Sequence, residues 1–247
     1  MSRNFDILRR EAVPRPEFLP TPVPSARSHG GARKRDDLAG VENEIAKLVQ
    51  RVFIIPGEVR APDVVAFCGI EEGAGCSWVC ARASEVLAVQ VPGRVCVIDA
   101  NLRRPSLHEH FRVEKGIGFA DAMKDSLPVA EYARPTWISK LWLMTSGAVG
   151  SEPNGALNPS RLRTRIAELR AEFDYLLMDT PPMSSYSDAA LLGQLTDGVI
   201  LVIDFASTRR EPARIAKESL EAAKIPVLGA VLNRRTYPIP EALYRRL

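Results

Sequence analysis

Residues 69–78 read GIEEGAGCSW and follow directly on an apolar stretch, VVAFC. Gly69, Gly73 and Gly75 would let the backbone bend tightly and aim its N–H groups at phosphate oxygens. Ser77 opens a helical pattern and stands where a hydroxyl group contacts Mg²⁺ in loops of this kind. The stretch therefore predicts a phosphate-binding turn between a strand and a helix.

Two aspartates end other apolar stretches, Asp99 after VCVI and Asp179 after YLLM. Two carboxylates and a hydroxyl group at one edge of a sheet can hold Mg²⁺ together with a nucleotide. A glycine-rich turn alone would be weak evidence, but all three features at strand ends are much stronger. The alternative stays open that the turn is empty and that the aspartates only cap strand-to-helix turns.

Cys76 occupies the position directly after the last glycine, where a phosphate-binding loop normally has Lys. A helix N-terminus would favour a redox-responsive thiolate at this place, but Glu71 and Glu72 oppose it. We therefore interpret Cys76 as a neutral replacement, so the loop lacks its usual positive charge.

The other cysteines and the paired histidines call for simpler interpretations. Cys68, Cys80 and Cys96 are expected to be buried thiols, because the four cysteines match neither zinc nor disulfide spacing. His108 and His110 lie two residues apart in an expected surface helix and are not taken as metal ligands.

Alternating apolar strands and amphipathic helices position these residues. The expected strands are 64–70, 94–100, 141–147, 175–182, 198–205 and 227–234, and the expected helices are 38–53, 77–90, 159–173, 187–196 and 208–224. Strands that are apolar on both faces favour a mostly parallel sheet with helices on each side, a doubly wound α/β fold. Such sheets bind ligands at the carboxyl ends of their strands. The arginine-rich helix 159–173 is expected to present a solvated face.

Composition and charge divide the chain of 247 residues into three parts. We expect residues 1–36 to form a disordered, proline-rich tail with a short helix at 2–11. Residues 37–236 are expected to form the folded domain, and residues 237–247 a C-terminal tail. Residues 1–35 carry a net charge of +5 against +3 for the whole chain, so the folded part is slightly acidic, which argues against nucleic-acid binding. With no apolar run near the ~20 residues of a membrane span, we expect a cytoplasmic protein.

The motifs together resemble the cytoplasmic kinase module of bacterial tyrosine kinases of the CpsD/CapB type, which act in capsule and exopolysaccharide synthesis. This family belongs to the MinD/ParA branch of P-loop proteins. The resemblance runs from about Glu42 to Arg235, and its most specific parts are IDANLRRPSLHEHF and FDYLLMDTPPMSSYSDAALLGQLTDGVILVI.

The resemblance implies ATP or ADP with Mg²⁺ as cofactors and places Ser77, Asp99 and Asp179 on the metal side. It also implies that Asn233 lies near the adenine and that Gly69, Gly73, Gly75, Cys76 and Ser77 bind the nucleotide. Tyrosines near the C-terminus, here Tyr237 and Tyr244, are the usual phosphate acceptors of the family. The usual activating partner is a membrane-anchored regulator of polysaccharide chain length.

The chain departs from the family pattern at the positions that do the chemistry. Besides Cys76, the family's Asp-x-Asp pattern reads Asp99-Ala100-Asn101, so the catalytic set of Asp99, Asn101 and Asp179 lacks a carboxylate. The family's oligomerising Glu-x-x-Arg-x-x-Arg pattern is reduced to Glu44, Lys47 and Gln50, which weakens the case for a homo-oligomer.

These departures favour a catalytically impaired relative that binds nucleotide weakly. It would bind a membrane polysaccharide regulator or a related tyrosine kinase, and through that partner lie at the inner membrane. The alternative is an active tyrosine autokinase, with Arg103 or Arg104 substituting for the lysine. A MinD/ParA-like partitioning ATPase fits less well, because the signature lysine near the start of the loop is absent.

Overall fold

The computed structural model describes residues 33–54, 61–148, 157–186 and 188–234. The chain divides between Leu38 and Ala39 into two compact units. Of the first unit, the structure describes only the helical backbone of residues 33–38. The second unit contains the sheet and the predicted site.

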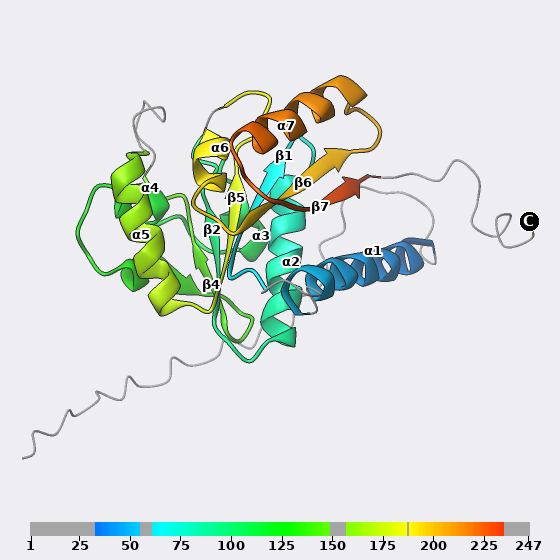
Figure 1. Ribbon diagram of the computed structural model, residues 1–247. Helices are drawn as coiled ribbons and strands as arrows, with labels where there is room; N and C mark the ends of the chain where they lie inside the picture. Colours follow the sequence, from blue (N-terminus) through cyan, green and yellow to red (C-terminus); the bar gives the residue numbers. More distant parts are fainter. Residues whose placement is uncertain (1–32, 55–60, 149–156, 187, 235–247) are drawn as a thin grey trace, which may run out of the picture. The chain divides into compact units, whose positions relative to one another are not determined.

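Within the described residues, a seven-stranded sheet forms the centre of the second unit (Figure 1). Its strands lie in the order β3-β4-β2-β5-β1-β6-β7, and all neighbours are parallel except β3 and β4. The strands are β1 (Val64–Gly69), β2 (Val95–Asp99), β3 (Ala133–Pro135), β4 (Leu141–Met144), β5 (Tyr175–Thr180), β6 (Gly198–Asp204) and β7 (Val227–Asn233). Because β1 pairs with β5 and β6, the turn after β1 opens at the middle of the sheet.

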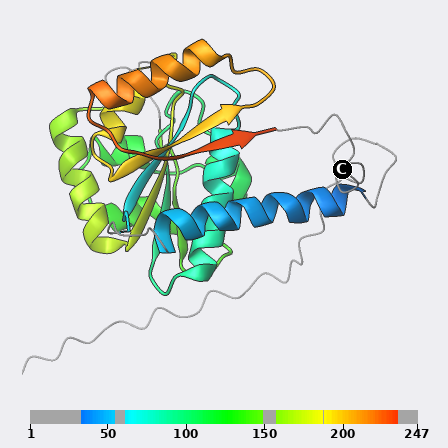
Figure 2. The same cartoon turned by 45° about the vertical axis from the view of Figure 1, so that its right-hand side comes forward.

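Helices connect the strands and cover both faces of the sheet (Figures 1 and 2). They are α1 (Arg33–Val49), η1 (Gln50–Ile54), α2 (Cys76–Gln90), α3 (Leu107–Phe111), α4 (Phe119–Ala122), η2 (Val129–Tyr132), α5 (Pro159–Glu172), α6 (Asp188–Gly193) and α7 (Arg210–Ala222). In β1, Val65 and Phe67 pack in one apolar cluster with α2, whereas Ala66 and Cys68 pack in another with α6 and α7. All four are fully buried, which explains why the strand is apolar at every position.

The predicted mostly parallel, doubly wound α/β fold is confirmed. The antiparallel strand β3 was not predicted, because its three residues are too short to show a pattern. Pro135 ends this strand, and its missing N–H is tolerated because β3 lies at the edge of the sheet.

The first helix differs from the predicted range 38–53. α1 begins at Arg33, inside the predicted tail, because the sequence RKRDD contains neither Pro nor Gly and favours a helix. Its continuation, η1, is a π-helix that ends at Ile54. Ile45 and Val52 are buried as their spacing predicts, whereas Val41 is exposed. The other predictions for the tails concern residues 1–32, with their short helix, and residues 237–247. These residues lie outside the described ranges.

The arginine-rich helix α5 presents the expected solvated face at Arg163 and Ala167, but two of its other arginines form contacts with distant segments. Arg165 is only 5% exposed, and its Nε donates to the carbonyl oxygen of Ala122 at 2.9 Å. Arg170 forms an ion pair with Asp197 at 2.8 Å. The aliphatic stem of arginine packs on apolar neighbours while its head reaches polar groups, and sequence periodicity does not reveal this use.

Candidate nucleotide-binding site

The glycine-rich turn between β1 and α2 has two positions in a left-handed conformation. Gly73 and Gly75 have φ angles of 79° and 81°, which side chains other than that of glycine strongly disfavour. A Cβ atom at residue 75 would lie 2.3 Å from Nδ2 of Asn233. The same amide donates to the carbonyl oxygen of Ala74 at 2.8 Å. The end of β7 therefore braces the turn, whereas Gly69 remains part of β1.

Helix α2 begins directly after this turn, at Cys76, and runs for 15 residues. The first N–H groups of an α-helix have no partner within the helix, and the helix dipole adds positive potential there. Gly75, the N-cap residue, has no side chain that would compete for these groups. This backbone arrangement suits an anion.

Asp99 and Asp179 lie directly opposite each other on the neighbouring strands β2 and β5. Both side chains are 0% exposed. Oδ2 of Asp99 accepts hydrogen bonds from the N–H groups of Ser106 and Leu107, both at 3.0 Å, which fixes the start of α3. Within the described residues, Oδ1 of Asp99 and both carboxylate oxygens of Asp179 have no hydrogen-bond partner of ordinary geometry. Three buried carboxylate oxygens are thus left to a ligand.

Burial raises the pKa of both carboxyl groups. The pKa of Asp99 rises to about 8, with a further contribution from Asp179, and its backbone hydrogen bonds oppose the rise. The pKa of Asp179 rises to about 7, although Ser77 and Cys76 lie close enough to lower it in part. Buried charges without partners are costly, and a divalent cation would stabilise the charged forms.

The oxygen atoms of Asp99, Asp179 and Ser77 suit Mg²⁺, which protein sites hold through one or two carboxylates together with substrate phosphates. Among the described residues, no group of three or more His, Cys, Asp or Glu side chains is arranged to hold a metal ion. A metal would therefore depend on phosphate oxygens as well as on these residues. His108 belongs to α3, where its Nε2 lies 3.8 Å from the carboxylate of Glu109.

The phosphate side of the turn lacks a lysine, and its thiols are neutral. Burial, and then Asp179, raise the pKa of Cys76 well above its ordinary value. Burial does the same to Cys80, again with a contribution from Asp179, and it raises the pKa of Cys68 to about 12. A thiolate at residue 76 is therefore disfavoured, and Cys76 contributes no charge to a bound phosphate.

Two arginines from the loop after β2 reach the rim of the site, and sequence reasoning did not place their partners. Nη2 of Arg103 lies 3.2 Å from Oδ2 of Asp188, and its guanidinium carbon lies 3.9 Å from the ring centre of Tyr186. Arg104 forms an ion pair with Glu72 of the glycine-rich turn. In the sequence, only the two neighbouring pairs Arg103–Arg104 and Glu71–Glu72 could have suggested these contacts.

Asn101 has a structural use in the same loop. Its Oδ1 accepts a hydrogen bond from the backbone N–H of Arg104 at 3.2 Å, an arrangement typical of a short polar turn. Its predicted membership of the catalytic set stays a prediction, as does the adenine contact of Asn233. The predicted phosphate acceptors Tyr237 and Tyr244 lie outside the described residues.

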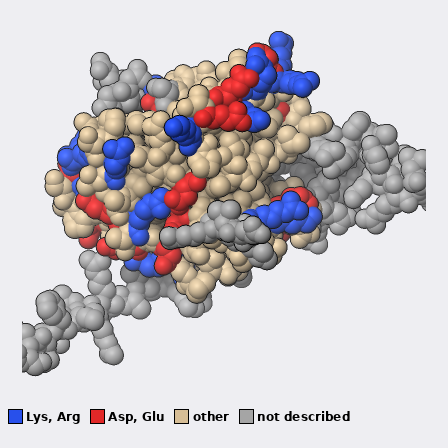
Figure 3. All heavy atoms as spheres, viewed as in Figure 1, with Lys and Arg blue, Asp and Glu red and all other residues tan. Residues whose placement is uncertain are grey.

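Acidic and basic side chains are interspersed on the face shown in Figure 3. On α7, Arg214 pairs with Glu211 and Glu218, each at 2.6 Å. On α1, Lys47 pairs with Glu44 at 2.7 Å, so these two members of the reduced oligomerisation pattern satisfy each other. Along the described ranges, no helix combines the length and apolar character needed to cross a membrane.

Comparison with known sequences gives relatives that are named as tyrosine-protein kinases. The chain is 32% identical over 161 residues to tyrosine-protein kinase YwqD of Bacillus subtilis, covering 65% of this chain and 68% of YwqD. The chain also aligns with longer relatives and spans only about a quarter of their length. For example, it is 28% identical to tyrosine-protein kinase Wzc of Salmonella typhi, and the alignment covers 24% of Wzc. No family model matches the chain.

Solved structures with the same fold include kinase domains and P-loop ATPases. The kinase domain of the Escherichia coli tyrosine kinase ETK matches with a TM-score of 0.72 and 23% identity, covering 89% of this chain and 88% of that domain. The septum site-determining protein MinD of Pyrococcus horikoshii, solved with Mg-ADP, matches with a TM-score of 0.60 and 22% identity over 74% of this chain and 76% of MinD. The fold is thus that of the MinD-like P-loop proteins, and the relative at 32% identity, YwqD, is named as a tyrosine-protein kinase. The chain belongs to the bacterial tyrosine-protein kinase family.

Proposed function

We propose that this chain is a catalytically impaired tyrosine-kinase relative that binds ADP or ATP with Mg²⁺ and acts as a regulator or scaffold in exopolysaccharide or capsule synthesis. One observation carries the proposal: the residues that would hold the metal lie together, whereas the position next to the phosphates carries no charge. Asp99, Asp179 and Ser77 remain together at the carboxyl edge, but a neutral Cys76 stands where the lysine would be.

The residues of the site divide the work of binding. Asp99, Asp179 and Ser77 would hold Mg²⁺, which neutralises phosphate charge when it is bound. The backbone N–H groups at the start of α2 would bind the phosphate oxygens. Asn233 keeps the turn in shape through its hydrogen bond to Ala74.

The missing lysine should affect nucleotide affinity and the rate of phosphoryl transfer to very different extents. A charge-assisted contact to phosphate contributes roughly 1.5–3 kcal/mol, or about one to two decades of affinity. A cation that stabilises the transferring phosphoryl group accelerates the reaction by about 10³–10⁵-fold, judged by arginine fingers. Loss of the lysine is therefore compatible with weak nucleotide binding, but without a substitute cation it is hard to reconcile with ordinary phosphoryl transfer.

The regulatory role requires a partner. By resemblance, that partner is a membrane regulator of polysaccharide chain length or a related tyrosine kinase, and it would bring this chain to the cytoplasmic side of the inner membrane. Self-association is a second route, although the Glu44–Lys47 pair occupies two positions of the oligomerising pattern. Pull-down from membranes with the full chain tests the partner directly.

The alternative function is an active tyrosine autokinase. The retained carboxylates and the two arginines at the rim favour it, since a guanidinium group can stabilise a transferring phosphoryl group. This alternative predicts ATP-dependent phosphotyrosine on the purified chain and its loss in Asp179→Ala.

Calorimetry tests the proposal. ADP or ATP, with Mg²⁺ present, is titrated into the native chain, into Cys76→Lys and into the neutral control Cys76→Ala. We expect weak binding by the native chain and by Cys76→Ala, and about 10–100-fold tighter binding by Cys76→Lys. Autophosphorylation by the native chain at the level of Cys76→Lys would contradict the catalytic impairment. Absence of binding by all three variants would contradict the nucleotide site itself.

A further inference from the structure

The two arginines at the rim of the site differ in how firmly they are held. Arg103 is 19% exposed and lies between the carboxylate of Asp188 and the ring of Tyr186, so it is committed to the loop before α6. The side chain of Arg104 is 76% exposed, and its ion-pair partner Glu72 is 48% exposed. Exposed ion pairs contribute little to stability, so Arg104 can exchange its partner at little cost.

The backbone of Arg104 is nevertheless fixed close to the site. Its N–H donates to Oδ1 of Asn101 at 3.2 Å. Two residues later, the loop is tied to Asp99 by the N–H of Ser106 at 3.0 Å. An exposed guanidinium group on an anchored backbone is well suited to contact an anion that enters beside it.

The partner of Arg104 belongs to the turn that would bind phosphate. Glu72 directly precedes Gly73, the first residue of the turn with a left-handed conformation. In the absence of a ligand, a carboxylate of the turn thus occupies the guanidinium group. A phosphate group presents the same type of oxygen acceptors and a higher charge, and arginine binds it in two-pronged geometry.

We propose that Arg104 supplies the phosphate-directed positive charge that Cys76 lacks, and that Glu72 holds Arg104 until a phosphate group displaces it. This inference rests on the proposed nucleotide site and names the residue that completes it. Glu72 then lowers affinity in two ways, because it competes for Arg104 and repels the phosphate. The site therefore binds the nucleotide weakly, and its affinity depends on the exchange of Glu72 for phosphate as the partner of Arg104.

Calorimetry with Mg²⁺ and ADP on the full-length chain tests the exchange in native protein, Arg104→Gln, Glu72→Gln and the double variant. We expect Arg104→Gln to weaken binding about 10-fold and Glu72→Gln to tighten it about 3–10-fold. The double variant should resemble Arg104→Gln, because most of the gain from Glu72→Gln requires the arginine. Glu211→Gln and Arg214→Gln, from an exposed pair on α7, are the matched controls and should not change affinity.

The outcomes separate the inference from the proposed function. Binding by native protein with equal affinity in Arg104→Gln overturns the inference and leaves the nucleotide site standing. A gain in Glu72→Gln that persists fully in the double variant also overturns it, since repulsion alone would then explain the effect. If native protein, Glu72→Gln and Cys76→Lys all fail to bind, the proposed nucleotide site fails and the inference with it.

Discussion

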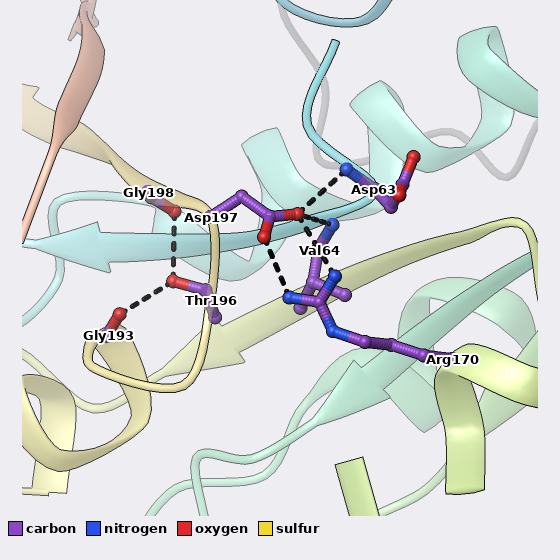
Figure 4. Close-up of polar contacts among 7 residues, drawn as sticks. All are labelled: Asp63, Val64, Arg170, Gly193, Thr196, Asp197 and Gly198. Atoms are coloured by element: carbon purple, nitrogen blue, oxygen red, sulfur yellow. Dashed lines mark hydrogen bonds and ion pairs between the residues drawn. The ribbon is translucent and has the colours of Figure 1, made fainter. Parts of the chain in front are cut away.

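A half-buried carboxylate at the amino end of the sheet, Asp197, and a buried one at the carboxyl end, Asp179, have opposite surroundings. At the amino end, Oδ2 of Asp197 accepts from the N–H groups of Asp63 at 2.9 Å and Val64 at 2.8 Å, and Arg170 pairs with the same carboxylate (Figure 4). At the carboxyl end, neither oxygen of Asp179 has a hydrogen-bond partner of ordinary geometry among the residues that the structure describes. The carboxylate of Asp197 is thus saturated with hydrogen bonds, whereas that of Asp179 is left open.

The pKa directions express the same difference. Burial acts to raise the pKa of Asp197, but Arg170 and the two N–H groups more than offset it, so the pKa is lowered. Burial raises the pKa of Asp179 to about 7. The hydrogen-bonded carboxylate of Asp197 therefore stabilises the fold. The buried carboxylate of Asp179 destabilises it, and a bound cation would remove this destabilisation. An open edge of this kind is typical of a binding site.

The largest expected effect is a gain in stability from Asp179→Asn. Removal of a buried charge whose pKa is raised from 3.8 to about 7 should increase the free energy of unfolding by about 4 kcal/mol at pH 8. Urea unfolding of the ligand-free protein measures it, with Glu109→Gln, 75% exposed, as a control that should change nothing. A loss of stability in Asp179→Asn would mean that Asp179 is a structural residue like Asp197.

The pH dependence sharpens this comparison. Because the folded pKa values of Asp99 and Asp179, about 8 and about 7, exceed the ordinary 3.8, the native state holds more protons between pH 4 and pH 8. Native stability should therefore fall as pH rises through this window, and the advantage of Asp179→Asn should shrink as pH falls and vanish below about pH 4. Asp197, with its lowered pKa, contributes stability that is lost only when pH falls below its ordinary value. An advantage of equal size at pH 5 and pH 8 would refute the electrostatic cause.

At the amino edge, Asp197→Ala should have the opposite sign. It removes the acceptor of two backbone N–H groups and the partner of Arg170, and we expect a loss of about 2 kcal/mol at pH 7. Thermal and urea unfolding measure the loss. Glu172→Ala, an exposed carboxylate near the same edge, is the control and should change stability by less than about 0.5 kcal/mol. A neutral Asp197→Ala would remove the distinction between the edges.

The smallest effect concerns Thr196, also at the amino edge. Its Oγ1 donates to the carbonyl oxygen of Gly193 at 2.8 Å and lies 3.1 Å from that of Gly198 (Figure 4). Thr196→Val should cost about 1 kcal/mol of stability and leave the affinity for Mg²⁺ and ADP unchanged. A change in affinity without loss of stability would show that the two edges are not separate in function.

Strand-level features were predictable from sequence because they depend on local patterns. Apolar runs with polar residues at their ends placed Asp99 and Asp179 at strand tips, and the structure has them at the ends of neighbouring strands. Parallel sheets bring such tips to one edge, so the candidate site followed from topology. Cys76 was recognised from its position after the last glycine alone.

Pairings between distant segments were not predictable. Glu72 and Arg104, or Arg170 and Asp197, meet only because the chain crosses over between strands. Nothing in the local pattern distinguishes Asp197 from a solvated turn residue, although it holds the start of β1. The short strand β3 and the buried state of Arg165 likewise depend on tertiary packing.

The most direct test of the central claim is the binding of ADP to the native chain with Mg²⁺ and with EDTA. If the retained carboxylates hold the metal and the turn lacks a lysine, affinity should depend on Mg²⁺ by at least about 10-fold, and less steeply in Cys76→Lys. Equal affinity in EDTA would contradict the metal role of Asp99 and Asp179. Complete absence of binding under both conditions would contradict a nucleotide site at this edge of the sheet.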